Sequence, residues 1–222
     1  WIVETGGQLA PEGLRSDKVQ VTGAAADHFA TGYAALLSGK AGKLPAAEEA
    51  ARLIEARHDA AASSGHLCSQ TGTYTATSKN DLIVADVLRK SLLALVAIER
   101  GETSVAFALM DEATAAEESM PIDFGPPAIV KPSHEIYGEM LLKAGQPERS
   151  RAQFEKALTR APRRTLSLTG LARAAAASGG GEPVVKACAD LKEIYSGADA
   201  TVRLPDVCAG SQKAEGIASP GR

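Results

Sequence analysis

The sequence predicts an all-helical protein, and three observations support this. Alanine is abundant and aromatic residues make up only 4% of the 222 residues, which favours closely packed helices over a sheet built from β-branched and aromatic side chains. Apolar residues recur at helical spacing in several long segments, and most of these segments stop at a glycine. The composition is 45% hydrophobic and 23% charged, as in ordinary globular chains. We therefore expect one continuous stack of helices over residues 23–209.

The first half of the chain contains two expected helical hairpins. In the first, about 24–62, the apolar pattern that begins at Phe29 stops at Gly39, and a second helix starts near Pro45. A polar segment rich in serine, threonine and glycine follows over 63–78, which is a long loop for a compact domain. The second hairpin, about 79–119, has a strongly apolar first helix and turns at Gly101.

Two more hairpins are expected after a proline-containing linker. The third covers about 133–161 and turns at 145–147, and the fourth covers about 163–196 and turns at 179–181. The two ends of the chain lack helical periodicity, so we expect an extended lead-in over 1–22 and a disordered tail over 210–222.

Charge and hydropathy exclude some classes of partner. A net charge of −3 and a pI near 5.9 argue against a nucleic-acid binder, which needs a basic surface. No apolar run approaches the roughly 20 residues needed to cross a bilayer. Charge is unevenly distributed, because most charged residues in 102–139 are acidic and most of those in 143–173 are basic. These segments are either two solvated faces or a bipolar docking surface through which two copies could self-associate.

The three cysteines bear on the cellular compartment. Cys188 and Cys208 could pair if a final segment folds back on the last helix, which would suit an oxidising compartment and leave Cys68 free. Because Cys188 also lies on an apolar helical stripe, a buried thiol is an equally open interpretation. The chain begins at Trp1 without a methionine, as a processed protein would. A periplasmic or secreted protein is the first hypothesis, and a cytoplasmic one is the alternative.

One segment shows small and large apolar residues at the spacings of a helix-turn-helix repeat. From His134 to Pro162 the residues that carry this pattern are Gly138, Ser150, Phe154, Ala157 and Pro162. The small residue at Gly138 recurs in the other hairpins as Gly32, Ala94 and Ala172. The chain thus resembles the tetratricopeptide-repeat family, in particular bacterial exported members, most clearly over 131–195 and more loosely over 24–119.

This resemblance implies a right-handed superhelical stack of about four antiparallel helix-turn-helix repeats. It also implies a non-enzymatic scaffold whose concave groove, lined by the first helix of each repeat, binds a peptide or protein partner without a cofactor. In the family's register the groove positions are Phe29, Tyr33, Ser91, Leu95, Glu135, Glu139, Thr169 and Arg173. The list combines apolar anchors with opposite charges, which suits recognition of an extended or amphipathic peptide.

A metal-handling function is the alternative hypothesis. His66 and Cys68 place an imidazole and a thiol on the 63–78 loop, and His58 lies near them in sequence. These are borderline ligands that copper and zinc accept, although their spacing matches no closed structural-zinc pattern.

An enzyme is the least favoured reading of the sequence. The carboxylate pairs Asp111-Glu112 and Glu117-Glu118 fall on one expected helix, where adjacent residues point in different directions and a solvated face explains them. The serines at 63–64 lack the flanking glycine pattern of a nucleophile elbow, and the glycines at 179–181 follow a helix where a phosphate loop would follow a strand. No catalytic residue is assigned.

Overall fold

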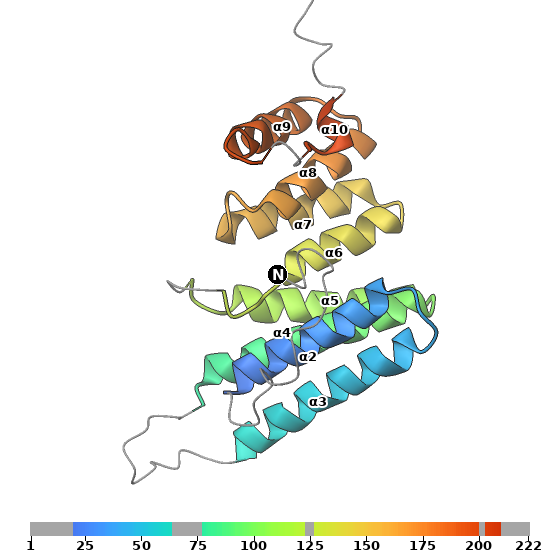
Figure 1. Ribbon diagram of the computed structural model, residues 1–222, viewed down its shortest axis with the longest axis vertical. Helices are drawn as coiled ribbons and strands as arrows, with labels where there is room; N and C mark the ends of the chain where they lie inside the picture. The colour runs from blue at the N-terminus through green and yellow to red at the C-terminus, as the bar shows by residue number, and fades with distance from the viewer. Residues whose placement is uncertain (1–19, 64–76, 123–126, 200–202, 210–222) are drawn as a thin grey trace, which may run out of the picture. The chain divides into compact units, whose positions relative to one another are not determined.

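In the computed structural model, the described part of the chain is entirely helical (Figure 1). The structure describes residues 20–63, 77–122, 127–199 and 203–209, and within them it contains nine α-helices and no strand. The chain divides into two compact units, residues 1–133 and 134–222, and we describe each by itself. Most of the expected lead-in over 1–22 lies outside the described residues, but its last residues do not, because α2 already begins at Val21. The 63–78 loop apart from its ends and the expected tail also lie outside the described residues.

Unit one consists of two helical hairpins. Its helices are α2 (Val21–Leu37), α3 (Lys43–Ser63), α4 (Lys79–Glu99) and α5 (Thr103–Glu118). Each helix packs on the one before it, and α2 also packs on α4, so the first helices of the two hairpins are neighbours. Consecutive hairpins that stack through their first helices are the arrangement of a helical repeat.

Local sequence signals determine where the helices of unit one begin and end. Ser78 and Asp81 form a capping box at the start of α4: the Ser78 hydroxyl accepts from the Asp81 amide at 3.1 Å, and the Asp81 carboxylate accepts from the Ser78 amide at 2.7 Å. At the other end, Gly101 has φ +81° and the Glu102 amide donates to the Ala97 carbonyl at 2.9 Å. A left-handed glycine of this kind closes a helix and reverses the chain.

The core of the described part of unit one is mainly apolar. Its largest side chains, each 0% exposed, are Phe29, Ile54, Leu88, Leu92 and Met110. Gly32 lets the hairpins approach closely, because a β-carbon there would lie 2.6 Å from Leu92 Cδ2 and 3.0 Å from Ala50 Cβ. The small residue expected at this position therefore has a direct packing reason.

Unit two contains two further hairpins and a terminal turn of helix. Its helices are α6 (Ser133–Lys143, in this unit from His134 onward), α7 (Pro147–Arg160), α8 (Thr165–Ala177), α9 (Glu182–Tyr195) and α10 (Asp206–Ala209). Helix α8 packs on both α7 and α9, and α10 packs on α8 and α9. The turn at Gly145, with φ +71°, joins α6 to α7.

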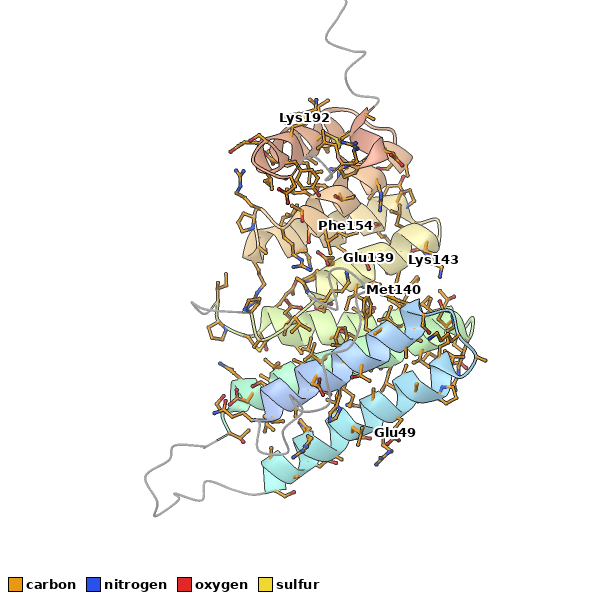
Figure 2. All side chains as sticks on the ribbon, viewed as in Figure 1. Glu49, Glu139, Met140, Lys143, Phe154 and Lys192 are labelled. Atoms are coloured by element: carbon orange, nitrogen blue, oxygen red, sulfur yellow. A yellow bond between two sulfur atoms is a disulfide. The ribbon has the colours of Figure 1, made fainter. Side chains whose placement is uncertain are left out.

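The phenyl ring of Phe154 is the centre of the packing between α6, α7 and α8. A β-carbon built on Gly138 of α6 would lie 2.8 Å from Phe154 Cε2, and one built on Gly170 of α8 would lie 2.2 Å from Phe154 Cε1. The Ser150 hydroxyl donates to the Gly138 carbonyl at 2.7 Å and joins α7 to α6 beside the ring. Two glycines therefore make room for one aromatic side chain, labelled in Figure 2.

The structure confirms the all-helical class and the helical repeat of hairpins. Helix ends fall within a few residues of the expected hairpins, and the fourth hairpin begins at Thr165, after Arg163 and Arg164. A right-handed superhelical stack of all four hairpins stays a prediction.

Candidate functional site

In unit one, two of the expected groove positions lie on α2 and are largely covered. Phe29 is 0% exposed and stacks on Tyr33, with the ring centroids 5.8 Å apart and the planes 13° from parallel. Lys131 of the linker places its Nζ 5.7 Å from the centroid of the Tyr33 ring, a cation–π contact, and is itself only 2% exposed. Phe29 is thus a core residue, and the chain's own linker contacts Tyr33.

The other two positions in unit one lie on α4. Ser91 is 1% exposed, and its hydroxyl oxygen has no hydrogen-bond partner among the described residues. Leu95 is half-buried. A position that is fully buried cannot contact a partner without rearrangement, so Leu95 is the more accessible of the two.

In unit two, Glu135 forms a buried ion pair. Its carboxylate is 0% exposed and accepts from Arg164 Nε at 2.7 Å, from Arg164 Nη2 at 3.0 Å and from the Ser167 hydroxyl at 2.5 Å. The two parallel bonds from the guanidinium give this pair a defined geometry. Glu135 therefore joins α6 to the beginning of α8.

Of the remaining three expected groove positions, two are exposed and one is buried. Glu139 on α6, labelled in Figure 2, and Arg173 on α8 are exposed, whereas Thr169 is 9% exposed. Glu139 and Arg173 occupy the same register position in consecutive hairpins. They present opposite charges at the surface of unit two.

The carboxylates of unit one take part in a network of charges along α3, α4 and α5. Asp86 accepts from Lys90 at 2.8 Å and from Arg89 at 2.9 Å, and Lys90 also reaches Glu112 at 3.0 Å while Arg89 reaches Glu55 at 3.5 Å. Burial raises the pKa of Asp86, but the hydrogen bonds from Lys90 and Arg89 outweigh it and leave that pKa below its ordinary value. Burial likewise lowers the pKa of Lys90, and the bonds to Asp86 and Glu112 raise it by more.

One carboxylate from each of the adjacent pairs Asp111-Glu112 and Glu117-Glu118 has a hydrogen-bond or ion-pair partner of its own. Glu112 binds Lys90, and Glu117, which is 6% exposed, accepts from the backbone amide of Ser133 at 2.7 Å and from its hydroxyl. An acceptor at the start of a helix satisfies an amide that lacks a partner within the helix. The Glu112 interaction joins α5 to α4, and the Glu117 interaction holds Ser133, at the end of the linker, against α5. The expectation of a solvated face is therefore wrong for Glu117, which is buried against its partner.

The metal-handling hypothesis depends on residues that the structure describes only in part. His58 Nδ1 lies 3.0 Å from Asp59 Oδ1. His66 and Cys68 lie outside the described residues. Among the described residues, no group of three histidine, cysteine, aspartate or glutamate side chains is placed to hold a metal ion.

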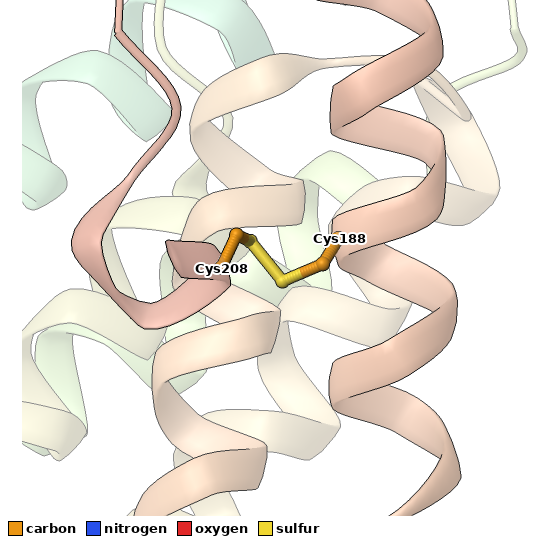
Figure 3. Close-up of a disulfide and its surroundings, with 2 residues drawn as sticks. All are labelled: Cys188 and Cys208. Atoms are coloured by element: carbon orange, nitrogen blue, oxygen red, sulfur yellow. A yellow bond between two sulfur atoms is a disulfide. The ribbon is translucent and has the colours of Figure 1, made fainter. Parts of the chain in front are cut away.

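Cys188 and Cys208 form a disulfide, one of the two arrangements that the sequence leaves open (Figure 3). The bond joins α9 to α10 and lies in a cluster with Leu168, Ala172 and Leu191. Both cysteines are at most 1% exposed. The final segment thus folds back on the last hairpin and is held there covalently.

A cavity of about 430 Å³ opens among α7, α8 and α9, and none of its lining residues is among the site residues expected from the sequence. Its apolar lining consists of Leu158, Pro162, Leu168, Leu171, Pro183 and Ala187. Its charged lining consists of Glu155, Glu182, Lys186 and Asp190. The volume falls within the range of small-ligand and peptide side-chain pockets.

Comparison with known proteins identifies no family for the chain. No protein-family model, no curated protein and no solved structure matches it. Within the described ranges, no helix combines the length and the apolar character needed to cross a membrane. What the fold itself defines is a helical-repeat protein.

Proposed function

We propose that this protein is a non-enzymatic helical-repeat scaffold that binds a peptide or protein partner on the first-helix face of unit two. The observation that carries the proposal is the exposure of Glu139 and Arg173 at the same register position of α6 and α8. A partner with an acidic and a basic group at matching separation would be held in one orientation, because reversed docking would place like charges together.

The base of this face is held by a buried carboxylate and its ion pair, which favours recognition. Glu135 precedes Glu139 by one helical turn, and its ion pair with Arg164 fixes α6 against the beginning of the helix that carries Arg173. Side chains held by packed neighbours lose less conformational freedom when a partner binds. The buried pair thus supports binding without contacting the partner.

The test compares partner capture by the intact chain and by a variant with Glu139→Ala and Arg173→Ala. Proteins retained from extract of the source cells are identified by mass spectrometry, and binding of the best candidate is then measured with purified components. We expect the double variant to bind at least about tenfold more weakly, as for the loss of two interfacial charge contacts.

The matched control is the double variant Glu49→Ala and Arg52→Ala, which also removes one charge of each sign. This exposed pair lies on α3 in the other unit, and Glu49 is labelled in Figure 2. Circular dichroism checks that both variants are folded. Equal binding by the intact chain and by the Glu139 and Arg173 variant would contradict the proposal.

We propose further that the protein works in an oxidising compartment, such as a bacterial periplasm or the cell exterior. The Cys188–Cys208 disulfide supports this, because such bonds are rare in reducing compartments. A thiol count on the denatured, non-reduced protein from its native source should find one free thiol, that of Cys68, among the three cysteines. Three free thiols would argue for the cytoplasm.

A further inference from the structure

The cavity among α7, α8 and α9 has features of a second binding site, separate from the proposed first-helix face. With 100° of rotation per helical residue, Leu168 and Leu171 point from α8 in a direction roughly 150° away from Thr169 and Arg173. The cavity lining includes the two leucines and neither of the other two residues. Occupation of the cavity therefore does not depend on the face proposed above.

The shape and lining of the cavity favour an apolar group. Leu158 of α7, Leu171 of α8 and Pro183 of α9 contribute to the apolar wall, so three helices surround it. A volume of about 430 Å³ is larger than one leucine side chain requires and fits two. Burial of apolar side chains would supply most of the binding free energy.

The charged groups around the cavity indicate the sign of the charge that a ligand should carry. Glu182, Lys186 and Asp190 follow one another at intervals of four residues along α9, so all three lie on the same side of that helix. None of these three forms an ion pair with another described residue. Glu155 on α7 adds a third carboxylate, which binds Arg151 at 2.9 Å. Because Glu155 is paired with Arg151, the charge at the opening comes from Glu182 and Asp190 against Lys186, which leaves the opening net acidic and complementary to a basic ligand.

We propose that this cavity binds a short peptide segment in which adjacent apolar residues are flanked by basic ones. The apolar side chains enter between Leu158 and Leu171, and the flanking cations lie against Glu182 and Asp190. The apolar lining alone would accept many molecules, and the acidic opening selects basic peptides among them.

The experiment is an NMR titration of the ¹⁵N-labelled full chain with three blocked tetrapeptides: Arg-Leu-Leu-Arg, Arg-Ser-Ser-Arg and Glu-Leu-Leu-Glu. The first should shift the amide signals of residues that line the cavity, with a Kd in the millimolar range or below, as expected for so small a ligand. The serine peptide lacks the apolar group and the glutamate peptide has the wrong charge. Neither should shift those signals up to about 10 mM.

The variant with Glu182→Lys and Asp190→Lys should bind the first peptide about tenfold more weakly, since it replaces two attractions by two repulsions at an exposed opening. The control variant Glu49→Lys with Asp111→Lys makes the same change in net charge on unit one and should bind as the natural chain does. Both are checked for folding by circular dichroism.

Three outcomes would overturn the proposal: no shifts in the cavity at the highest peptide concentration, equal binding of either comparison peptide, or shifts confined to another surface. None of these outcomes bears on Glu139 and Arg173, so failure here leaves the proposed function open to its own test.

Discussion

In unit one the ion-pair network of Asp86 and Lys90 stands at the edge of an apolar core, whereas in unit two the carboxylate of the Glu135–Arg164 pair lies inside the packed helices. Asp86 and Lys90 remain 28% and 18% exposed, and each has two partners. Glu135 is 0% exposed, and its carboxylate is held by Arg164 and Ser167. Unit two also contains a disulfide, of which the described part of unit one has none.

This difference implies that the two units respond differently to the loss of one group. An exposed network has water as a substitute for any missing partner, so each member contributes little. A buried ion pair has no such substitute, and removal of one partner leaves an uncompensated charge. Single substitutions should therefore be tolerated in the unit one network and costly at the unit two pair.

The largest effect is expected for Glu135→Ala. It leaves the Arg164 guanidinium without its carboxylate, and we expect the free energy of unfolding to fall by about 3 kcal/mol, the lower end for a broken buried pair, because the Arg164 side chain is 19% exposed and water can reach part of it. Asp86→Ala in unit one should cost less than about 1 kcal/mol. Urea denaturation of both variants gives the comparison.

A second variant distinguishes two contributions to the loss of stability: the missing ion pair and the charge that is left without a partner. When both members are replaced, as in Glu135→Leu with Arg164→Met, no charge is left unpaired, and apolar replacements of this kind are often neutral or stabilising. The double variant should be more stable than Glu135→Ala. If it is less stable, the buried charge is not the cause of the loss.

The disulfide should contribute the next largest effect, confined to unit two. It closes a loop with a sequence separation of 20 residues, for which the chain-entropy estimate is about 3 kcal/mol. We expect Cys188→Ala with Cys208→Ala to increase hydrogen exchange in α9 and α10, read peptide by peptide by mass spectrometry, and to leave α2 to α5 unchanged. Equal increases in both units would show that their stabilities are coupled.

A smaller effect is expected at the glycines that contact Phe154. In Gly170→Ala the new methyl would lie 2.2 Å from an aromatic carbon, and overpacking of this kind costs about 1 to 3 kcal/mol. The gain of about 1 kcal/mol in helix propensity offsets part of it. In Gly32→Ala of unit one the new methyl meets the flexible end of Leu92 first, so the melting temperature of this variant should fall less.

Gly138→Leu inserts a larger group against the Phe154 ring and should lower the melting temperature more than either alanine variant. An unchanged melting temperature would contradict the repeat register.

Much of the fold could be predicted from the sequence because its signals are local. The apolar spacing of 79–99 and the turn at Gly101 define α4 without reference to the rest of the chain. Gly138 could be recognised as a packing position because it recurs at the repeat spacing. The second glycine at the Phe154 ring, Gly170, does not recur in this way, so only the packed structure reveals it.

The candidate sites were less predictable because they depend on side chains from several helices. Glu135 has the sequence pattern of a solvated groove residue, and its partner Arg164 comes 29 residues later, just before α8. Tyr33 looks like an exposed aromatic anchor until Lys131 is placed over its ring. The cavity among α7, α8 and α9 has no sequence signature, since its apolar residues would be assigned to the core of each helix.

The smallest expected effect is the pH dependence of the unit one network. The pKa of Asp86 is lowered in the folded chain, so its stabilising contribution is present above about pH 4, where an unfolded aspartate is ionised, and is lost as pH falls through the lower folded value. The pKa of Lys90 is raised, so its contribution is present below about pH 10 and is lost as pH rises through the higher folded value. Asp86→Asn should reduce the loss of stability between about pH 5 and pH 2, by less than about 1 kcal/mol because the group is partly exposed. Urea denaturation across this range measures the difference, with Glu102→Gln as a control. If Asp86→Asn and the natural chain lose the same stability on acidification, the Asp86 carboxylate is not responsible for the loss, and the expectation is wrong.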